Sequence, residues 1–198
     1  MNIGIINYGM GNIQSVYNAF KYHKVEASVT KLEDIEKFDS LVLPGVGAFK
    51  DTAALLNPYK KNIKRFISSG KPFLGICVGL QYLYEMSFEN GKWEGLGYFK
   101  GVVKKLPEVK LPQVGWNNLI VKGKTPILKN IPSASYVYYI NSYAADKKNA
   151  FATSFYGTEF AAVVGKKNVF GTQFHPEKSG KIGLKILKNF IEVTKNCL

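Results

Sequence analysis

Cys77 and the residues beside it form the first segment whose composition points to chemistry. The apolar run 72–76 leads into Gly75-Ile-Cys77-Val-Gly79, and a helical segment is expected to follow at once. Small residues two positions before and after a reactive side chain let a strand turn sharply into a helix. A thiol at such a turn lies near the positive end of the helix, where a thiolate is stabilised. The segment therefore predicts a nucleophilic cysteine, and it leaves the Val78 N–H free to donate to an oxyanion. The alternative interpretation is a buried structural cysteine.

His175 and Glu177 supply the other groups that thiol chemistry needs. They lie in the segment Val169-Phe-Gly-Thr-Gln-Phe-His-Pro-Glu-Lys-Ser179, where an apolar run ends and Pro176 stops regular structure. Open α/β sheets carry their active sites at the carboxyl ends of strands. A histidine there can take the thiol proton and return it to a leaving group, while a carboxylate orients the imidazole. The pattern predicts a Cys–His–Glu triad; His23, in a lysine-flanked stretch, is expected on the surface.

Strand, loop and helix alternate in the half of the chain that contains the cysteine. Apolar runs and their turn residues predict strands at 2–6, 25–29, 40–43 and 72–76. The spacing of apolar residues predicts helices at 13–22, 59–69 and 78–84. This alternation predicts a mostly parallel central sheet with helices on both faces, which is an α/β fold.

The second half has a different pattern. Residues 96–164 hold short runs rich in Val, Tyr and Phe, separated by Gly, Asn, Pro and Lys. They predict short strands, including antiparallel pairs or an extension of the sheet. A last central strand is expected at 169–172 and a closing helix at 181–193. No repeat or linker interrupts the chain, so residues 1–198 are predicted to form a single domain.

Composition excludes several classes of protein. With 46% hydrophobic and 21% charged residues, the chain is typical of globular proteins. Two cysteines do not make a disulfide framework, and no run approaches the ~18 apolar residues of a membrane span. No signal peptide is recognised either. We therefore expect a soluble cytoplasmic protein. The net charge of +13 comes from scattered lysines, which indicates a solvated surface or a face for an acidic partner rather than nucleic-acid binding. One histidine and one cysteine are too few ligands for a metal site.

The cysteine and histidine motifs together resemble those of the class I (triad) glutamine amidotransferases, and the resemblance covers essentially the whole chain. It implies that family's single-domain fold, L-glutamine as substrate and no cofactor. Pro44-Gly-Val-Gly-Ala-Phe49 matches the loop that supplies a second oxyanion donor and lines the glutamine pocket. The residues implied are Gly45, Val46 and Val78 for the oxyanion hole, and Gly47, Gln81, Ser142 and Tyr143 for glutamine.

Three more segments resemble the glutaminase subunits of imidazole glycerol phosphate synthases. They are the residues 8–16, 115–117 and 138–143. In that family a separate (β/α)8-barrel cyclase receives the ammonia and forms imidazole glycerol phosphate for histidine biosynthesis. The resemblance implies that Tyr138, Trp116 and Lys178 face the barrel. It also implies that the partner and its ligand activate the glutaminase, with a turn of the Gly45–Gly47 backbone as the means.

Three residues in two segments depart from that pattern. Asn141 stands where the family usually has histidine, and Gln113-Val114 where it usually has His-Met; both are expected on the partner-facing side. A paralogous subunit that supplies ammonia for amidination of a bacterial surface sugar is therefore the alternative function. Three more distant alternatives are a pyridoxal-phosphate-synthase glutaminase, a cysteine hydrolase or peptidase, and a non-catalytic scaffold. The first lacks its glycine-rich N-terminal segment here, the second would not need the Phe174–Glu177 segment, and the third would be expected to lose a triad member.

Overall fold

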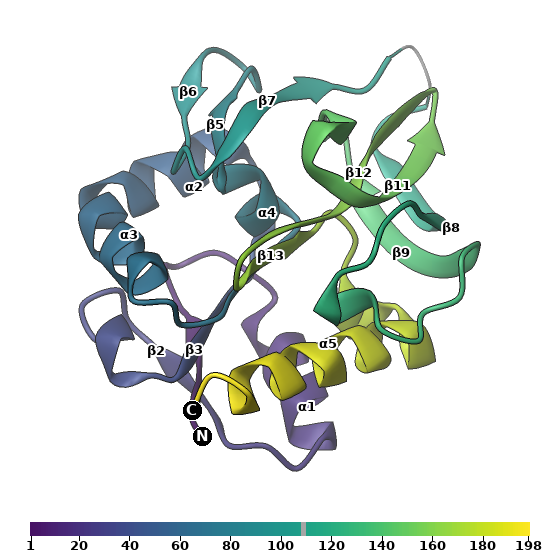
Figure 1. Ribbon diagram of the computed structural model, residues 1–198. Coiled ribbons are helices and arrows are strands. Elements are labelled where there is room, and N and C mark those ends of the chain that lie inside the picture. The colour runs from purple at the N-terminus through teal and green to yellow at the C-terminus, as the bar shows by residue number, and fades with distance from the viewer. Residues whose placement is uncertain (108–109) are drawn as a thin grey trace.

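A nine-stranded mixed sheet runs through the protein in this computed structural model, which describes residues 1–107 and 110–198 (Figure 1). Its strands are β1 (Ile3–Ile6), β2 (Ala27–Thr30), β3 (Ser40–Leu43), β4 (Phe73–Ile76), β8 (Gln113–Val121), β9 (Ser135–Asn141), β11 (Ala150–Tyr156), β12 (Thr158–Lys166) and β13 (Val169–Thr172). They follow the spatial order β2-β1-β3-β4-β13-β12-β11-β8-β9.

The first five strands of that order run parallel to their neighbours, and we call them the parallel half. Every residue of β1, β3, β4 and β13 is buried. Strands covered on both faces need apolar residues at each position, which explains why these segments are continuous apolar runs. The strands predicted at 40–43 and 169–172 are confirmed at those bounds, and the others lie within two residues of the prediction.

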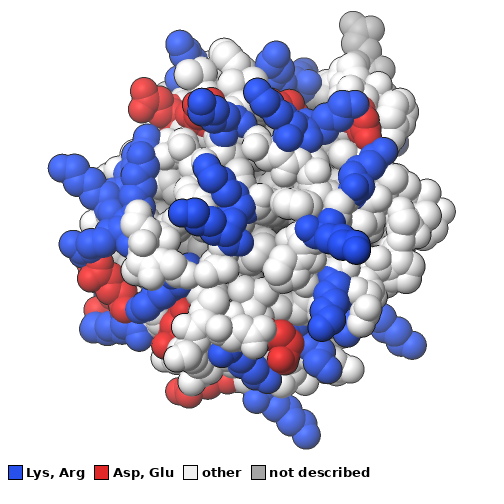
Figure 2. All heavy atoms as spheres, in the orientation of Figure 1, with Lys and Arg blue, Asp and Glu red and all other residues white. Residues whose placement is uncertain are grey.

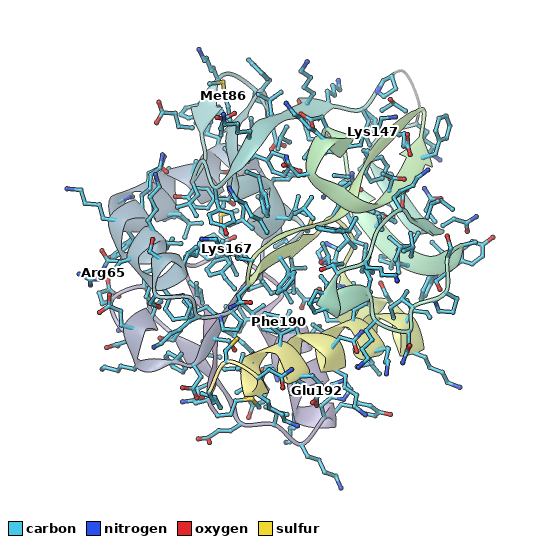
Figure 3. The ribbon with its side chains drawn as sticks, viewed as in Figure 1. Arg65, Met86, Lys147, Lys167, Phe190 and Glu192 are labelled. Carbon is cyan, nitrogen blue, oxygen red and sulfur yellow. The ribbon has the colours of Figure 1, made fainter. Side chains whose placement is uncertain are left out.

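Helices cover both faces of the sheet, as the alternation predicts. The helices are α1 (Ile13–Tyr22), α2 (Phe49–Leu56), α3 (Lys60–Ser68), α4 (Val78–Tyr82) and α5 (Gly180–Lys195), with single 3-10 turns at Ile35–Lys37, Asn57–Tyr59, Pro126–Leu128, Lys147–Asn149 and Pro176–Lys178. Buried residues of α1 and α5 form one apolar cluster with Ile5, whereas those of α2 and α3 form another with the next residue, Ile6. Helix α4 contributes Val78 to the first cluster and Leu80 and Tyr82 to the second. In α5, Phe190 faces the sheet and Glu192 faces solvent (Figure 3).

Two helices differ from the prediction. The sequence analysis did not predict α2, whose buried Phe49, Ala53 and Leu56 have helical spacing over only eight residues. Its first N–H, at Phe49, is held by a distant carboxylate, because Glu89 Oε2 accepts from it at 2.6 Å. The helix predicted at 78–84 ends at Tyr82, since Tyr84 pairs with Phe99 in a second sheet.

The remaining strands of the large sheet, β12, β11, β8 and β9, run antiparallel to their neighbours, and we call them the antiparallel half. A smaller sheet has the order β10-β7-β5-β6, with strands β5 (Tyr84–Ser87), β6 (Trp93–Glu94), β7 (Phe99–Lys105) and β10 (Tyr143–Ala145). Antiparallel pairing in the second half is therefore confirmed. The chain passes from the large sheet to the small one at Ser142, between β9 and β10.

No helix in the described part of the chain has both the length and the apolar character that crossing a membrane requires.

Candidate active site

Cys77 occupies the turn between β4 and α4 in a strained backbone conformation, with φ 55° and ψ −110°. Such a conformation costs about 1–3 kcal/mol and persists only where the surroundings enforce it. Here the Cys77 N–H donates to Thr172 O at 2.7 Å. A Cβ on Gly79 would lie 2.0 Å from Leu43 O, and one on Gly75 would lie 2.5 Å from Gly79 O. Both glycines are therefore required by close backbone approach, as the sequence analysis expected.

The Cys77 thiol is buried and, besides His175, contacts a backbone carbonyl and a side-chain amide. Its Sγ lies 3.8 Å from Ile140 O and 3.7 Å from Gln173 Nε2. The carbonyl can accept only from a protonated thiol, whereas the amide N–H can donate to the sulfur in either state. Helix α4 follows with only five residues, so few peptide dipoles add up behind the sulfur.

The structure brings His175 and Glu177 together at the end of β13. His175 Nδ1 lies 2.8 Å from Glu177 Oε1, and the two side chains are 2% and 1% exposed. Asn12, from the segment before α1, places its Nδ2 3.5 Å from the same oxygen as a second, weaker donor. The His175 N–H donates to Tyr138 O at 2.9 Å, which fixes the backbone of the histidine against β9. The imidazole is thus oriented by a buried carboxylate, the arrangement that a triad needs.

The protonation of His175 follows from these neighbours. Burial alone lowers the pKa of the imidazole, but its interactions with Cys77 and with Glu177 outweigh burial and raise the pKa to about 10. A nearby negative group favours the charged form of a base. The ring can therefore accept the thiol proton and hold it until a leaving group takes it.

A cavity of about 230 Å³ opens beside the thiol. The residues that line it are Gly47, Cys77, Val78, Gln81, Glu89, Pro112, Ile140, Asn141, Ser142 and Tyr143. All four residues that the resemblance implies for glutamine binding are in this set. Gln81 donates from Nε2 to Tyr143 O at 2.9 Å and to Gln173 Oε1 at 3.1 Å, so the amide oxygen is the part of Gln81 left for a ligand.

Glu89 is a lining residue that the sequence analysis missed. It lies between β5 and β6, and burial raises the pKa of its carboxyl. No local motif marks it, because the contact with Phe49 N–H that holds it comes from a segment 40 residues away. Among the described lining residues, Glu89 is the acidic one.

The loop implied for the oxyanion hole lies against the cysteine turn. A Cβ on Gly45 would lie 2.6 Å from Gly79 N and 2.9 Å from Val78 Cβ, so glycine permits the close contact. Val78 is the first residue of α4, and its N–H therefore has no partner within the helix. Gly47 has φ +93° and lines the cavity, whereas Val46 is 38% exposed and does not. The assignment of Gly45, Val46 and Val78 to an oxyanion hole stays a prediction.

The residues implied for partner binding share an outer surface. Trp116 in β8 is 55% exposed and lies opposite Tyr138 in β9, with 5.8 Å between their ring centroids. Lys178 is exposed in the turn that contacts β9. Val114 and Tyr136 are exposed on the same side of the pair, and we call Val114, Trp116, Tyr136 and Tyr138 the β8–β9 face.

The expected position of Gln113 and Asn141 on that face is wrong. The two residues lie directly opposite each other in β8 and β9, and both are buried. Side chains alternate along a strand, so 113 and 141 point inward where 114, 116 and 138 point outward. Asn141 lines the cavity beside Cys77 and donates to Tyr143 O at 3.1 Å. Of the departures, Gln113 and Asn141 therefore lie on the inner side of the two strands, whereas Val114 lies on the β8–β9 face.

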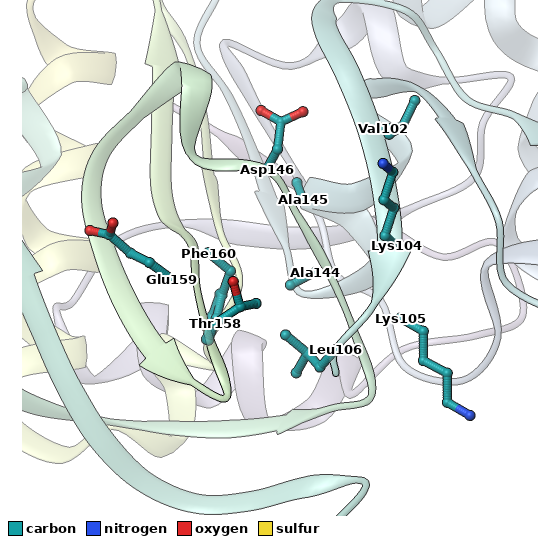
Figure 4. A pocket seen from close by; sticks show the side chains of 10 residues that line it. All are labelled: Val102, Lys104, Lys105, Leu106, Ala144, Ala145, Asp146, Thr158, Glu159 and Phe160. Atoms are coloured by element: carbon teal, nitrogen blue, oxygen red, sulfur yellow. The ribbon is translucent and has the colours of Figure 1, made fainter. Parts of the chain in front are cut away.

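A second cavity, of about 230 Å³, contains no triad residue. It lies where β7 and β10 meet β12, with Leu106, Ala144 and Phe160 at its floor and Lys104, Asp146 and Glu159 around it (Figure 4).

The charged surface shows no concentrated site. Lys and Arg side chains are spread over the face shown in Figure 2 rather than gathered in one patch, with few acidic residues between them. In the described part of the chain, no three His, Cys, Asp or Glu residues are placed to share a metal ion.

Comparison with known proteins gives a consistent result. The family model described as glutamine amidotransferase class-I matches residues 4–193. The chain is 52% identical to imidazole glycerol phosphate synthase subunit HisH of Caldanaerobacter subterraneus subsp. tengcongensis, covering 99% of this chain and 100% of that protein. It is 47% identical to the protein of the same name from Methanosarcina mazei, covering 96% and 98%. Among solved structures, PurLQS from Thermotoga maritima has a TM-score of 0.80 at 22% identity, covering 96% of this chain and 97% of that one, which shows the fold.

Proposed function

The chain belongs to the class I glutamine amidotransferases, and from this we propose that it is the glutaminase subunit of an imidazole glycerol phosphate synthase. One observation supports the chemistry most strongly. Cys77, held at a strained turn, faces a cavity beside the buried His175–Glu177 pair. The similarity to subunits of that synthase, over nearly the full length of both chains, supports the pathway.

The proposed reaction hydrolyses L-glutamine to L-glutamate and ammonia. The side-chain amide of glutamine lies over Cys77, and His175 takes the thiol proton as the sulfur attacks the amide carbon. Backbone N–H groups of Val78 and the Gly45–Gly47 loop stabilise the oxyanion of the tetrahedral intermediate. His175 returns its proton to the departing ammonia, and water then hydrolyses the γ-glutamyl thioester.

The polar groups of the cavity fit the other end of the substrate. Glu89 supplies a negative charge for the α-ammonium group, and the free amide oxygen of Gln81 supplies an acceptor. Among the described residues that line the cavity there is no Lys or Arg, so neutral donors such as the Ser142 hydroxyl would bind the α-carboxylate. A cavity of about 230 Å³ has room for one amino acid.

The β8–β9 face is the proposed docking surface for a (β/α)8-barrel cyclase. Exposed aromatic residues such as Trp116 are typical of the buried centre of interfaces, and Lys178 adds a charge at the edge. Ile140 lies next to this face and its carbonyl contacts the thiol, so ammonia formed at Cys77 has a short path toward a docked partner. We place this complex in the cytoplasm, where the two free thiols stay reduced.

Cys77→Ala tests the chemistry. Glutamate release by the chain mixed with its cyclase should fall by about 10⁴-fold or more, because the nucleophile is lost. Binding to the cyclase should persist, as measured by calorimetry. Cys197→Ala, which removes the exposed thiol, is the control and should keep full activity. Glutaminase activity remaining in Cys77→Ala would refute the assignment.

The pathway is tested by the partner. Glutamate production should rise strongly when the histidine-pathway cyclase of the same organism and its nucleotide ligand are added together. An absence of both binding and stimulation would favour the alternative, a paralogous subunit that supplies ammonia for amidination of a surface sugar.

A further inference from the structure

Gln173 is a buried polar residue that the proposed reaction does not yet use. It follows β13, and its side chain is 0% exposed. Its backbone N–H donates to Ala162 O at 2.9 Å, which fixes the residue against β12. A buried amide must find partners for both its oxygen and its nitrogen. One of those partners is the sulfur of Cys77.

The orientation of the Gln173 amide is determined by a chain of contacts that begins at a backbone carbonyl. Tyr143 O can only accept, so the group of Gln81 that lies 2.9 Å from it must be the Nε2 amide. The same Gln81 Nε2 lies 3.1 Å from the Gln173 side chain, which must therefore present its Oε1 there. It follows that Gln173 Nε2 is the atom 3.7 Å from Cys77 Sγ.

This N–H favours the charged form of the cysteine. The neutral thiol can donate to Ile140 O at 3.8 Å, but a thiolate has no proton to donate and would meet the carbonyl oxygen unfavourably. Gln173 acts in the opposite sense, because hydrogen bonds to an anion are stronger than those to a neutral group and stabilise the charged form. The short α4 adds little dipole, so a side-chain donor has more effect here than behind a long helix.

We propose that Gln173 is a catalytic residue whose Nε2–H stabilises the Cys77 thiolate, with Gln81 holding the amide in the donating orientation. The proposal rests on the proposed function in taking Cys77 as the nucleophile. It gives Gln81 a second role, since this residue both lines the substrate cavity and fixes the group that contacts the sulfur. Neither role requires a change in the backbone of the cysteine turn.

The test is the pH dependence of alkylation of Cys77 by iodoacetamide, measured without glutamine in a Cys197→Ser background. Only the thiolate reacts, so the midpoint of the rate profile reports how easily the thiolate forms. Gln173→Met keeps the length of the side chain but removes the donor. The midpoint should move up by about one pH unit, with alkylation below the midpoint slowed about tenfold. In the glutaminase assay, kcat should fall more than KM changes.

Two further variants make the result specific. Gln173→Glu keeps an acceptor for Gln81 but places a carboxylate beside the sulfur, and it should move the midpoint further up. Asn189→Leu removes another buried amide, one that lies in α5 and donates to Ile127 O and Lys129 O, and it should leave the midpoint unchanged.

An unchanged midpoint in folded Gln173→Met would overturn the proposal, as would an equal shift in Asn189→Leu. If Gln173→Met does not fold, an unchanged midpoint in Gln173→Glu would overturn the proposal instead. Failure here is distinct from failure of the proposed function, because full activity in Cys77→Ala would refute that function whatever the alkylation profile shows.

Discussion

The parallel and antiparallel halves of the large sheet contribute different things to the site. Strands β1, β3, β4 and β13 are buried at every residue, and the cysteine turn and the histidine follow two of them. Strands β8 and β9 alternate between buried and more exposed residues. A fully buried frame fixes the reacting groups, while a half-exposed ribbon supplies a pocket wall on one side and the β8–β9 face on the other.

The two halves meet at the triad mainly through backbone atoms of β9. Ile140 O contacts the Cys77 thiol, and Tyr138 O accepts from the His175 N–H. Side chains on the outer side of β9 are therefore free to serve a partner without entering the chemistry. Chemistry should therefore be sensitive to substitutions in the parallel half, and partner binding to substitutions in the antiparallel half.

The largest expected effect is on folding, where α4 packs against β3 of the parallel half. Gly79→Ala, in α4, would place a Cβ 2.0 Å from the Leu43 carbonyl oxygen, a backbone atom that cannot move aside cheaply. We expect the free energy of unfolding in urea to fall by more than about 3 kcal/mol. Gly123→Ala, in the loop that follows β8 of the antiparallel half, is the control, because its Cβ meets only the Phe151 ring, at 3.1 Å. Equal losses in the two variants would contradict the distinction between the halves.

A smaller effect is expected on partner binding. Trp116→Ala should weaken binding to the cyclase by about 2 kcal/mol in calorimetry, because a central aromatic contact would be lost. The melting temperature and the glutaminase chemistry of the free chain should change little. Tyr22→Ala is the matched control, since this aromatic residue is 69% exposed but lies at the C-terminal end of α1, on neither β8 nor β9. Weaker binding in the Tyr22 variant alone would place the interface elsewhere.

The smallest effect is on the pH dependence of stability. His175 has a pKa of about 10 in the folded chain, above its usual 6.5, so its contribution to stability is complete below pH 6.5 and is lost as pH rises through 10. His175→Gln should therefore flatten the decline in melting temperature over that range by a few degrees. Cys77→Ala removes one cause of the raised pKa and should give a partial flattening. An unchanged pH profile in His175→Gln would show that the imidazole is not paired in the folded chain.

The sequence predicted the parallel half better than the antiparallel half. Buried strands are continuous apolar runs, and the cysteine and histidine each lie in a compact motif, so local patterns sufficed to place Cys77, His175 and Glu177 at strand ends. Short strands that alternate in exposure carry a weaker signal. For this reason the bounds of β7 to β12 were not predicted individually.

The residues that were missed are those fixed by contacts distant in sequence. Glu89 and α2 hold each other through one hydrogen bond between segments 40 residues apart, and the motif that ends at Phe49 gives no sign of this partner. The inward direction of Gln113 and Asn141 depends on strand register, and a shift of one residue would reverse it. The contact from Gln173 to the sulfur likewise joins strands that only the folded sheet brings together.

The exposed aromatic residues of the β8–β9 face have a consequence for colloidal behaviour. The backbone edge of β9 is covered where Tyr138 bonds to His175 and Ser179, but the apolar side chains of the face remain open to a second copy of the chain. A net charge of +13 opposes such self-association, since two copies repel each other before those surfaces meet. The same repulsion does not act against an acidic or neutral protein. Lysines scattered along the sequence can thus keep the chain from associating with itself while leaving the β8–β9 face accessible.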